Sequence, residues 1–462
     1  MKQSNHNTLP LKTKWLFASG DFAKTLIIVM TMAYSLYFFT EFIGMNPAVA
    51  STIILIAKIW DFINDPMMGT LVDHTRSKEG KCRIWFKYVA IPGGIILFLN
   101  FFVPGQLSSV GETVWFAVFY TLQGMASTAL QIPQNILMSR LTQDEVERAQ
   151  INSFRGYFGI AANLFASVLG IPIVMLFGGE DMRKGFLWLG LICGILYTAN
   201  YLLLFWCTKG YEPVDEDLPA AEKAEAPKEK VKLSEILGNA PWLLVLASYF
   251  VVNLAQASVG SAGLFYFQYN LGNVALYSIF SFISIIASLI VFPMLSRLVA
   301  KFGSAKLIVI GNAIGAIFYM IRYITHDANN FILMGCSAIG TIGQILASSV
   351  VLLVVYDSFI YMKHKTGGKP VPEGVLVSAY SVAYKVGMAL GAPLGGWLLA
   401  TVPYVAGAAT QEQSVLNVFF SLNTLVPALG FIVAMLFGLL LLKYDKQIRE
   451  YKALDAAAKE QA

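Results

Sequence analysis

The sequence predicts an all-α membrane protein with twelve transmembrane helices arranged in two six-helix bundles. Three observations predict this fold class. The 462 residues are 56% hydrophobic and 13% charged, with a mean hydropathy of +0.62, whereas a soluble domain is about 25% charged. The apolar residues are grouped in stretches of about 20, the length that crosses a bilayer core of roughly 30 Å. One long charged segment divides these stretches into six and six.

The apolar stretches give the positions of the twelve predicted helices. They lie at residues 17–42, 47–73, 85–104, 113–138, 151–177, 186–207, 241–268, 274–298, 306–324, 330–361, 375–401 and 414–443. Cytoplasmic loops carry an excess of Lys and Arg. If the N-terminus is cytoplasmic, the outer loops hold only Arg183, Lys184 and Arg322. We therefore expect a multi-pass protein of the bacterial cytoplasmic (inner) membrane, with both termini in the cytoplasm. We expect no cleavable signal peptide, because the first fifteen residues are polar and the apolar stretch that follows is a full span.

The charged segment at residues 208–240 predicts a linker. It is rich in Glu, Lys, Ala and Pro, and such a composition cannot bury a core. The expected organisation is an N-terminal six-helix bundle at 1–207, the cytoplasmic linker, a C-terminal six-helix bundle at 241–443 and a cytoplasmic tail at 444–462. Two bundles joined by a long central segment are typical of transporters built from two related halves.

Two carboxylates lie within the second predicted helix, where charge is costly. An aspartate at the bilayer centre costs roughly 2.5–3.5 kcal/mol. Asp61 and Asp65 are four residues apart and share one helix face with Asn64. Their hard oxygens suit Na⁺, Li⁺ or a proton, so this face is a candidate cation site. The alternative is a helix-packing ion pair with Lys58, three residues before Asp61.

A second polar group lies on the fourth predicted helix. Thr128, Gln131 and Asn135 follow three- and four-residue spacing and share one face. The Thr128 hydroxyl could bind a cation, and the two amides could bind the hydroxyl groups of a sugar. The alternative is that these side chains only hold helices together by hydrogen bonds.

Three cationic residues and one tyrosine complete the candidate site. Arg155 begins the fifth predicted helix, and Lys385 lies deep in the eleventh beside Tyr384. Lys24 lies in the first helix, three residues after Asp21, so a local ion pair is the alternative for Lys24. For Lys385 the alternative is a charge pair that stabilises one conformation. An intramembrane charge is otherwise a functional candidate.

Other classes of function find no support in the sequence. It contains no phosphate-binding P-loop and no Gly-x-Ser-x-Gly nucleophile motif, so we expect neither ATP-driven transport nor an enzyme. The basic residues lie between apolar stretches and form no single patch, which argues against nucleic-acid binding. The histidines and cysteines are scattered, so we expect no cofactor other than a coupling ion. We expect a monomer.

The segment Lys58–Arg83, KIWDFINDPMMGTLVDHTRSKEGKCR, resembles the signature of the glycoside–pentoside–hexuronide:cation symporters (melibiose permease-like) of the major facilitator superfamily. GDFAKTL, IPQN, NSFRG and YDSFIYMKHKTGG extend the resemblance over most of the chain. The resemblance implies the major facilitator fold and cation-coupled symport of a sugar.

The resemblance also implies roles for individual residues. The family's cation site, which can hold Na⁺, falls on Asp61, Asn64, Asp65 and Thr128. Its substrate site falls on Lys24, Thr25, Gln131, Asn135, Arg155 and Lys385, to which we add Tyr384. The segment that follows the second helix resembles a cytoplasmic latch whose charges favour one conformer, with Asp73, Arg76, Lys81 and Arg83 as its candidates.

Departures from the family pattern bear on the substrate. Melibiose-transporting members have carboxylates where this chain has Thr25 and Gln131, and a tryptophan where it has Asn135. Without those acids, Lys24, Arg155 and Lys385 leave a more positive site. We therefore expect an anionic sugar, such as a hexuronide, a glucuronide or a sulfonated sugar, or a related glycoside. The alternatives are a lysolipid or lipid transporter or a proton-coupled exporter of the same fold, and a membrane receptor that transports nothing.

Overall fold

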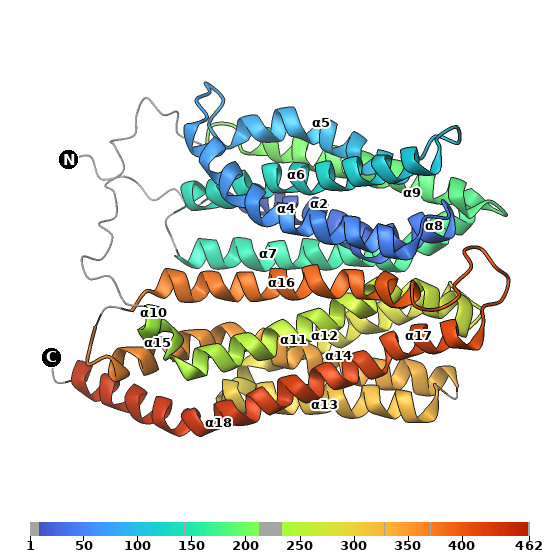
Figure 1. Ribbon diagram of the computed structural model, residues 1–462. Coiled ribbons are helices and arrows are strands. Elements are labelled where there is room, and N and C mark those ends of the chain that lie inside the picture. The colour runs from blue at the N-terminus through green and yellow to red at the C-terminus, as the bar shows by residue number, and fades with distance from the viewer. Residues whose placement is uncertain (1–8, 143–144, 212–232, 328, 370, 461–462) are drawn as a thin grey trace. The chain divides into compact units, whose positions relative to one another are not determined.

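The computed structural model describes residues 9–142, 145–211, 233–327, 329–369 and 371–460. Every regular element in these ranges is a helix (Figure 1), which confirms the predicted all-α class. The α-helices are α1 (Leu11–Ala18), α2 (Gly20–Val29), α3 (Ser35–Glu41), α4 (Pro47–His74), α5 (Arg83–Leu99), α6 (Ser109–Leu141), α7 (Glu145–Asn163), α8 (Gly170–Gly178), α9 (Met182–Cys207), α10 (Leu233–Leu237), α11 (Ala240–Phe265), α12 (Leu276–Phe302), α13 (Ser304–Thr325), α14 (Asn330–Ser349), α15 (Val351–Lys365), α16 (Glu373–Leu399), α17 (Gln413–Asn423) and α18 (Leu425–Glu460). Of the π-helical segments in these ranges, η1 (Met30–Tyr34) and η2 (Leu164–Leu169) interrupt longer helical stretches, and η4 (Tyr266–Asn270) ends the stretch that α11 begins.

Each of the twelve predicted spans falls on a helical stretch. Ten helical stretches in the described part of the chain are long and apolar enough to cross a membrane. The other two spans correspond to α5, which has 17 residues, and to α6, which carries many polar side chains. At the C-terminus, α18 continues to Glu460 through the segment expected as a tail. Most of the expected linker, residues 212–232, lies outside the described residues.

The chain divides into two compact units. Unit 1 comprises Met1–Ala221, Phe267–Ser281 and Gly396–Gln411, and unit 2 comprises Glu222–Tyr266, Phe282–Gly395 and Glu412–Ala462. In unit 1, α5 packs against α6 and α9, α2 packs against α7 and α9, and α4 packs against α6. In unit 2, α13 packs against α14 and α18, and α11 packs against α15 and α18. The polar residues of interest on α2, α4, α6 and α7 therefore all belong to unit 1.

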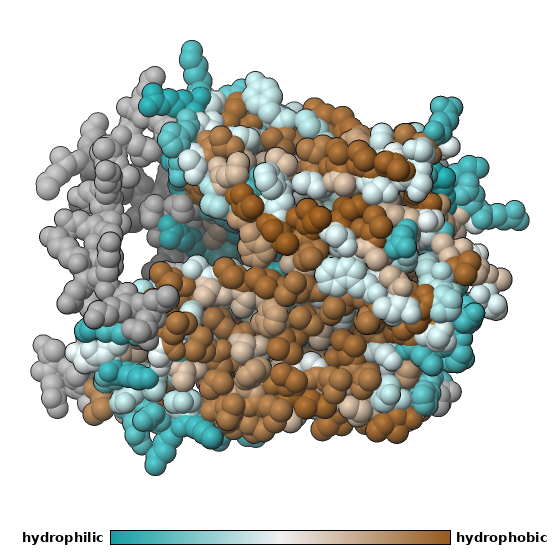
Figure 2. Space-filling model, in the orientation of Figure 1, coloured by the Kyte–Doolittle hydropathy of each residue, from teal (hydrophilic) through white to brown (hydrophobic). Residues whose placement is uncertain are grey.

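The outer surfaces of the helices are apolar. Figure 2 shows hydrophobic side chains over the middle of the helices and hydrophilic side chains at their ends. On α4, for example, Ile56, Ile63 and Leu71 are exposed, whereas Ile54 and Ala57 are buried. A soluble monomer rarely exposes extensive apolar surface. The apolar exterior is that of a helix in lipid, in agreement with the predicted membrane protein.

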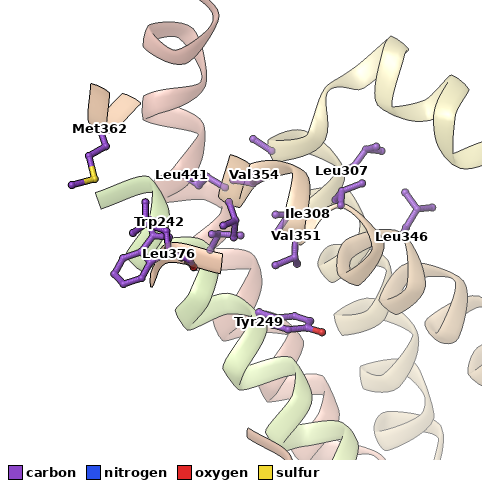
Figure 3. Packing of buried hydrophobic residues seen from close by; sticks show 14 of the residues in the cluster. Trp242, Tyr249, Leu307, Ile308, Leu346, Val351, Val354, Met362, Leu376 and Leu441 are labelled. Atoms are coloured by element: carbon purple, nitrogen blue, oxygen red, sulfur yellow. Dashed lines mark hydrogen bonds between the residues drawn. The ribbon is translucent and has the colours of Figure 1, made fainter. Parts of the chain in front are cut away.

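Unit 2 has a dense apolar core (Figure 3). Trp242 and Tyr249 of α11 pack there with side chains from α13, α14, α15, α16 and α18, including Leu307, Ile308, Leu346, Val351, Val354, Met362, Leu376 and Leu441. The indole Nε1 of Trp242 donates a hydrogen bond to the Leu376 carbonyl at 3.1 Å. This bond satisfies the polar atom of a large buried ring and ties α16 to α11.

Unit 2 also holds a buried ion pair at the end of α13. The Arg322 guanidinium donates from Nε and Nη2 to the two carboxylate oxygens of Asp327, each at 2.9 Å. Its Nη1 donates to the Asn423 carbonyl at 3.1 Å, and the Tyr266 hydroxyl donates to Asp327. Both charged side chains are 2% exposed. The bidentate geometry and the extra donors compensate the desolvation of the two charges.

The π-helical segments η1 and η2 meet inside unit 1. The hydroxyl of Tyr34, at the end of η1, donates to the carbonyl of Ala166 in η2 at 2.6 Å. The Tyr34 side chain is fully buried. In η1, the Thr31 hydroxyl donates to the Ile27 carbonyl at 2.7 Å. π-Helical turns free backbone groups and are frequent at functional sites, and here side-chain hydroxyls supply donors to the carbonyls.

One buried carboxylate in unit 1 accepts hydrogen bonds from segments that are far apart in the sequence. Glu41, at the end of α3, is 8% exposed. It accepts hydrogen bonds from the hydroxyl of Tyr269 at 2.6 Å, from the backbone N–H of Gly407 at 3.0 Å and from the hydroxyl of Tyr404. Gly407 has φ +67°, a backbone conformation that favours glycine. We call Glu41 and these three donors the Glu41 cluster.

Candidate functional site

The two aspartates of α4 lie beside α6. The Thr128 hydroxyl of α6 donates a hydrogen bond to Asp65 Oδ1 at 3.1 Å. Asp61 is paired within its own helix, because its Oδ2 accepts from Lys58 Nζ at 3.4 Å. The structure thus brings together three of the four residues that the sequence assigns to a cation site, and it adds the local ion pair that was the alternative for Asp61.

A close approach of α6 to α4 keeps Asp61 in place. A methyl group added at Gly124 of α6 would lie 2.5 Å from Asp61 Oδ1. One turn earlier on α6, the buried ring of Tyr120 lies 6.0 Å from Lys58 Nζ, a distance at the limit of a cation–π contact. Only a residue without a side chain allows the Asp61 carboxylate to lie against the backbone of α6.

Asn64 occupies the buried face of α4 between the two aspartates. Its side chain is 6% exposed, and its Nδ2 has no hydrogen-bond partner in the described structure. A buried donor without a partner costs about 1–3 kcal/mol. The Asn64 amide group therefore has an unused hydrogen-bond donor beside the Asp61 and Asp65 carboxylates.

The oxygen atoms of this region fit a small hard cation. Within the described ranges, no three His, Cys, Asp or Glu residues lie together as a metal site, so carboxylates alone would not enclose an ion. The Thr128 hydroxyl and the Asn64 amide oxygen would have to complete the ligands. Pro66 of α4 has no N–H, which leaves the carbonyl of Phe62 without its usual helical donor. Na⁺ or a proton fits such a set.

A second cluster joins α2, α6 and α7 around Asp21. The Asp21 carboxylate accepts hydrogen bonds from Arg155 Nε and, at 3.1 Å, from Gln134 Nε2. Lys24 Nζ lies 3.7 Å from the other Asp21 oxygen. Arg155 also donates through Nη2 to Asn135 Oδ1 at 2.9 Å. We call Asp21, Lys24, Gln134, Asn135 and Arg155 the Asp21 cluster.

The structure places the other predicted substrate residues apart from this hydrogen-bond network. Gln131 of α6 donates to the hydroxyl of Ser127 on its own helix. Thr25 is half-buried, and its hydroxyl faces Gly159 of α7, where an added methyl group would lie 3.4 Å away. Neither side chain bonds to Arg155 or Lys24.

Tyr384 and Lys385 belong to α16 in unit 2, and both are exposed. The ring of Tyr384 stacks on that of Tyr249, with centroids 6.2 Å apart and an interplanar angle of 27°. The hydroxyls of Tyr249 and Tyr380 lie 3.1 Å apart. Aromatic faces of this kind can stack on a sugar ring, which is compatible with Tyr384 as a candidate substrate residue.

The predicted latch residues behave in two ways. Lys81 Nζ pairs with Asp73 Oδ1 at 3.1 Å, and Arg76 is exposed. Arg83 is instead buried, with 6% exposure. It donates to the carbonyl of Phe205 at 2.8 Å and to the hydroxyl of Thr208 at 3.2 Å. Arg83 therefore caps the C-terminus of α9, a position where a cation stabilises a helix.

Two residues of the Asp21 cluster were absent from the predicted site. The sequence indicates Asp21 as a local partner for Lys24, and the candidate substrate residues on the fourth predicted helix do not include Gln134. Gln134 is fully buried, and it precedes Asn135 in the IPQN segment. The signal for Asp21 is its carboxylate within a predicted membrane span, because an intramembrane charge is by default a functional candidate.

The chain resembles known sugar transporters over nearly its whole length. The family model described as "MFS/sugar transport protein" matches residues 16–446. An isoprimeverose transporter of Lactiplantibacillus pentosus is 26% identical over 95% of this chain and 90% of its own length. From Escherichia coli (strain K12), a putative glycoside/cation symporter is 27% identical over 91% of this chain and 89% of its own, and a putative sulfoquinovose importer is 27% identical over 94% and 92%.

A solved structure supports the same fold. The crystal structure of a D-xylose–proton symporter aligns with a TM-score of 0.64 at 13% identity, covering 93% of this chain and 97% of that one. The family match covers more than nine-tenths of the chain, which confirms the predicted resemblance and excludes an enzyme. The chain belongs to the MFS/sugar transport protein family and is a multi-pass membrane transporter.

Proposed function

We propose that this protein is a secondary active transporter that carries a sugar or sugar derivative together with a cation, Na⁺ or H⁺, by alternating access. The observation that carries the cation coupling is the hydrogen bond from Thr128 to Asp65, beside Asp61. Two intramembrane carboxylates with a hydroxyl ligand on the neighbouring helix have the chemistry of a cation site. The relative described as a glycoside/cation symporter supports this coupling.

In this proposal the cation binds Asp61, Asn64, Asp65 and Thr128. Binding neutralises the carboxylates, which lowers the cost of keeping them away from water. Within the described residues Arg155 is paired with Asp21 and not with Asp61 or Asp65, so in this proposal it stays in the substrate site throughout. Cation and sugar must raise each other's affinity by the same factor.

The two sites share the helix α6. Thr128 lies in the cation site, and Gln134 and Asn135 lie in the Asp21 cluster. Gln134 follows Thr128 by six positions, which is about 9 Å along the helix axis. A small shift of α6 on cation binding would therefore also move groups that hold Arg155, which provides a physical route for coupling.

We further propose that the sugar is anionic: a hexuronide, a glucuronide or a sulfonated sugar. We also propose that the protein acts as a monomer and that both of its termini lie in the cytoplasm. Lys24 and Arg155 supply two positive charges, of which Asp21 balances one. The relative described as a putative sulfoquinovose importer supports an anionic substrate, since a sulfonated sugar carries a negative charge. The scarcity of basic residues in the predicted outer loops supports the orientation.

Counterflow and gradient-driven uptake in proteoliposomes test the proposal. Thr128→Ala should reduce cation-stimulated uptake at least tenfold, and Asp65→Asn should abolish it. The matched control is Thr113→Ala, because the Thr113 hydroxyl on the same helix donates to the Ser109 carbonyl of its own helix at 2.9 Å. Undiminished sodium- and proton-driven uptake in Asp65→Asn would exclude the assigned cation site. Absence of any sugar uptake by the wild-type protein would refute the transport proposal itself.

A further inference from the structure

Asp21 is a buried carboxylate that the proposed cation coupling does not use. Its residue is 8% exposed, and it lies on α2. Its partners come from three places: Arg155 on α7, Gln134 on α6 and Lys24 one turn further along α2. A buried charge is costly unless it is paired and hydrogen-bonded. Asp21 is paired with Arg155 and Lys24, both candidate substrate residues, and Arg155 also donates a hydrogen bond to it.

The Arg155 guanidinium is bonded firmly through its Nε, whereas its Nη1 group is bonded more weakly. Its Nε is bound to Asp21, and one Nη2 donor is bound to Asn135 at 2.9 Å. In the described structure its Nη1 contacts Met138 Sδ at 3.3 Å, a weak sulfur acceptor, and lies 3.5 Å from Asn152 Oδ1. A guanidinium has five donors in a fixed plane. Fixing the Nε side therefore orients the remaining donors of the Nη side.

Lys24 is held less firmly than Arg155. Its Nζ is 3.7 Å from Asp21, beyond an ordinary hydrogen bond, and its side chain is 31% exposed against 15% for Arg155. An ammonium group has three donors. Lys24 is therefore the cation of this cluster that can move toward a ligand without breaking a close hydrogen bond.

The charges of the Asp21 cluster do not cancel. Lys24 and Arg155 contribute two positive charges and Asp21 contributes one negative charge, which leaves one net positive charge. A ligand with a single anionic group would neutralise this site, whereas an uncharged sugar would leave the surplus charge buried. Without Asp21 the surplus would be two charges, and Arg155 would lose the partner that orients it.

We propose that Asp21 is a positioning residue that sets the charge selectivity of the substrate site. Asp21 fixes Arg155 for hydrogen bonds to sugar hydroxyls and leaves Lys24 as the group that meets a single carboxylate or sulfonate of the sugar. This inference rests on the proposed sugar-transport function. It adds that Arg155 binds the hydroxyl groups of the sugar and that Lys24 binds its anionic group.

The test compares matched pairs of sugars that differ only at C6. Methyl β-D-glucuronide and methyl β-D-glucoside form one pair, and the corresponding galacturonide and galactoside form a second. The Kd of each is measured by calorimetry on the purified full-length protein, with and without sodium. The informative quantity is the ratio of affinities for the acid and the neutral sugar, which a loss of folding or packing alone does not change.

Asp21→Asn should raise the ratio of acid to neutral affinity about tenfold or more, because a unit charge that lies within several ångströms of the ligand is removed. Asp21→Glu keeps the charge and should leave the ratio near that of the wild type. Lys24→Gln should lower the ratio about tenfold, and the double variant Asp21→Asn/Lys24→Gln should return it toward the wild-type value. The control is Asp181→Asn, since this acid is 49% exposed at the start of α9, and its ratio should not change.

The outcomes separate the two proposals. If the wild-type protein binds neither member of either pair, the proposed substrate class is wrong, and this inference falls with it. If the wild type binds them and Asp21→Asn weakens both members equally, Asp21 is only structural and this inference alone is overturned. If Asp21→Asn does not fold, an unchanged ratio in Lys24→Gln overturns the role of Lys24 and with it the charge-selective site.

Discussion

Replacing Gly124 by alanine tests the geometry of the cation site directly. The added methyl group would lie 2.5 Å from Asp61 Oδ1, 3.4 Å from Cγ and 3.6 Å from Oδ2. An ordinary contact needs about 3.4 Å or more, so Oδ1 must move by about 1 Å. The Asp61 bond to Lys58, 3.4 Å long, would change with this movement. The change therefore displaces one carboxylate oxygen while the rest of α4 keeps its packing.

The expected loss of cation affinity follows from that displacement. A hard cation binds a carboxylate oxygen at roughly 2.5 Å. Moving the oxygen to roughly 3.5 Å weakens the attraction by about 2 kcal/mol at an effective dielectric constant of about 20. This change corresponds to about a thirtyfold increase in Kd. The free energy of unfolding should fall by no more than about 1–3 kcal/mol, the usual range for overpacking.

Calorimetric titration of Na⁺ into the purified protein in lipid nanodiscs measures this effect, together with the pH dependence of sugar binding if the coupling ion is H⁺. Gly69→Ala is the matched control, because it adds the same methyl group to α4 where no heavy atom lies within 4 Å. Gly124→Ala should weaken cation binding, and Gly69→Ala should not. Equal cation affinity in both variants would show that Asp61 is not a cation ligand.

Two further predictions concern stability. Asp327→Asn should destabilise the protein by about 3–5 kcal/mol, because it leaves the buried Arg322 guanidinium without its counter-charge; an unchanged midpoint of thermal unfolding in detergent would contradict this. The pKa of Glu147 lies below its ordinary value of 4.5, because the hydroxyl of Thr142 and the ammonium of Lys14 donate to its carboxylate. Its contribution to stability should therefore be complete above pH 4.5 and be lost as the pH falls through the lowered pKa, and Glu147→Gln should remove that acid-dependent part of the thermal unfolding curve.

Much of the fold could be predicted, because each membrane-spanning helix corresponds to a continuous apolar stretch of sequence. The span predicted at 47–73 corresponds to α4, Pro47–His74. Pro47 suits the first position of a helix, and its preceding residue Asn46 caps it by accepting from the N–H of Ala48 at 2.9 Å. The π-helical interruptions could not be predicted, because they depend on tertiary contacts such as that of Tyr34 with Ala166.

The candidate site was predictable where its residues are close in sequence. Asp61 and Asp65 share a helix face. The spacing on the fourth predicted helix indicates Thr128 as a possible cation ligand, and the resemblance to the symporter family groups it with the two aspartates; its hydrogen bond to Asp65 agrees with that expectation. That these residues bind a cation stays a prediction. The partnership of Asp21 with Arg155 spans 134 residues of sequence, so no local pattern reveals it. Only the packing of α2 against α7 brings the two side chains together.

The Glu41 cluster has a consequence for the order in which the protein is assembled during synthesis. Tyr404 and Gly407 follow Glu41 by 363 and 366 residues, so the ribosome completes most of the chain before these donors exist. Until then the Glu41 carboxylate must stay hydrated, because burying it without donors is costly. The first half of the chain therefore cannot complete its own compact unit when it emerges. A fragment that ends at the central linker would lack the residues that close over Glu41.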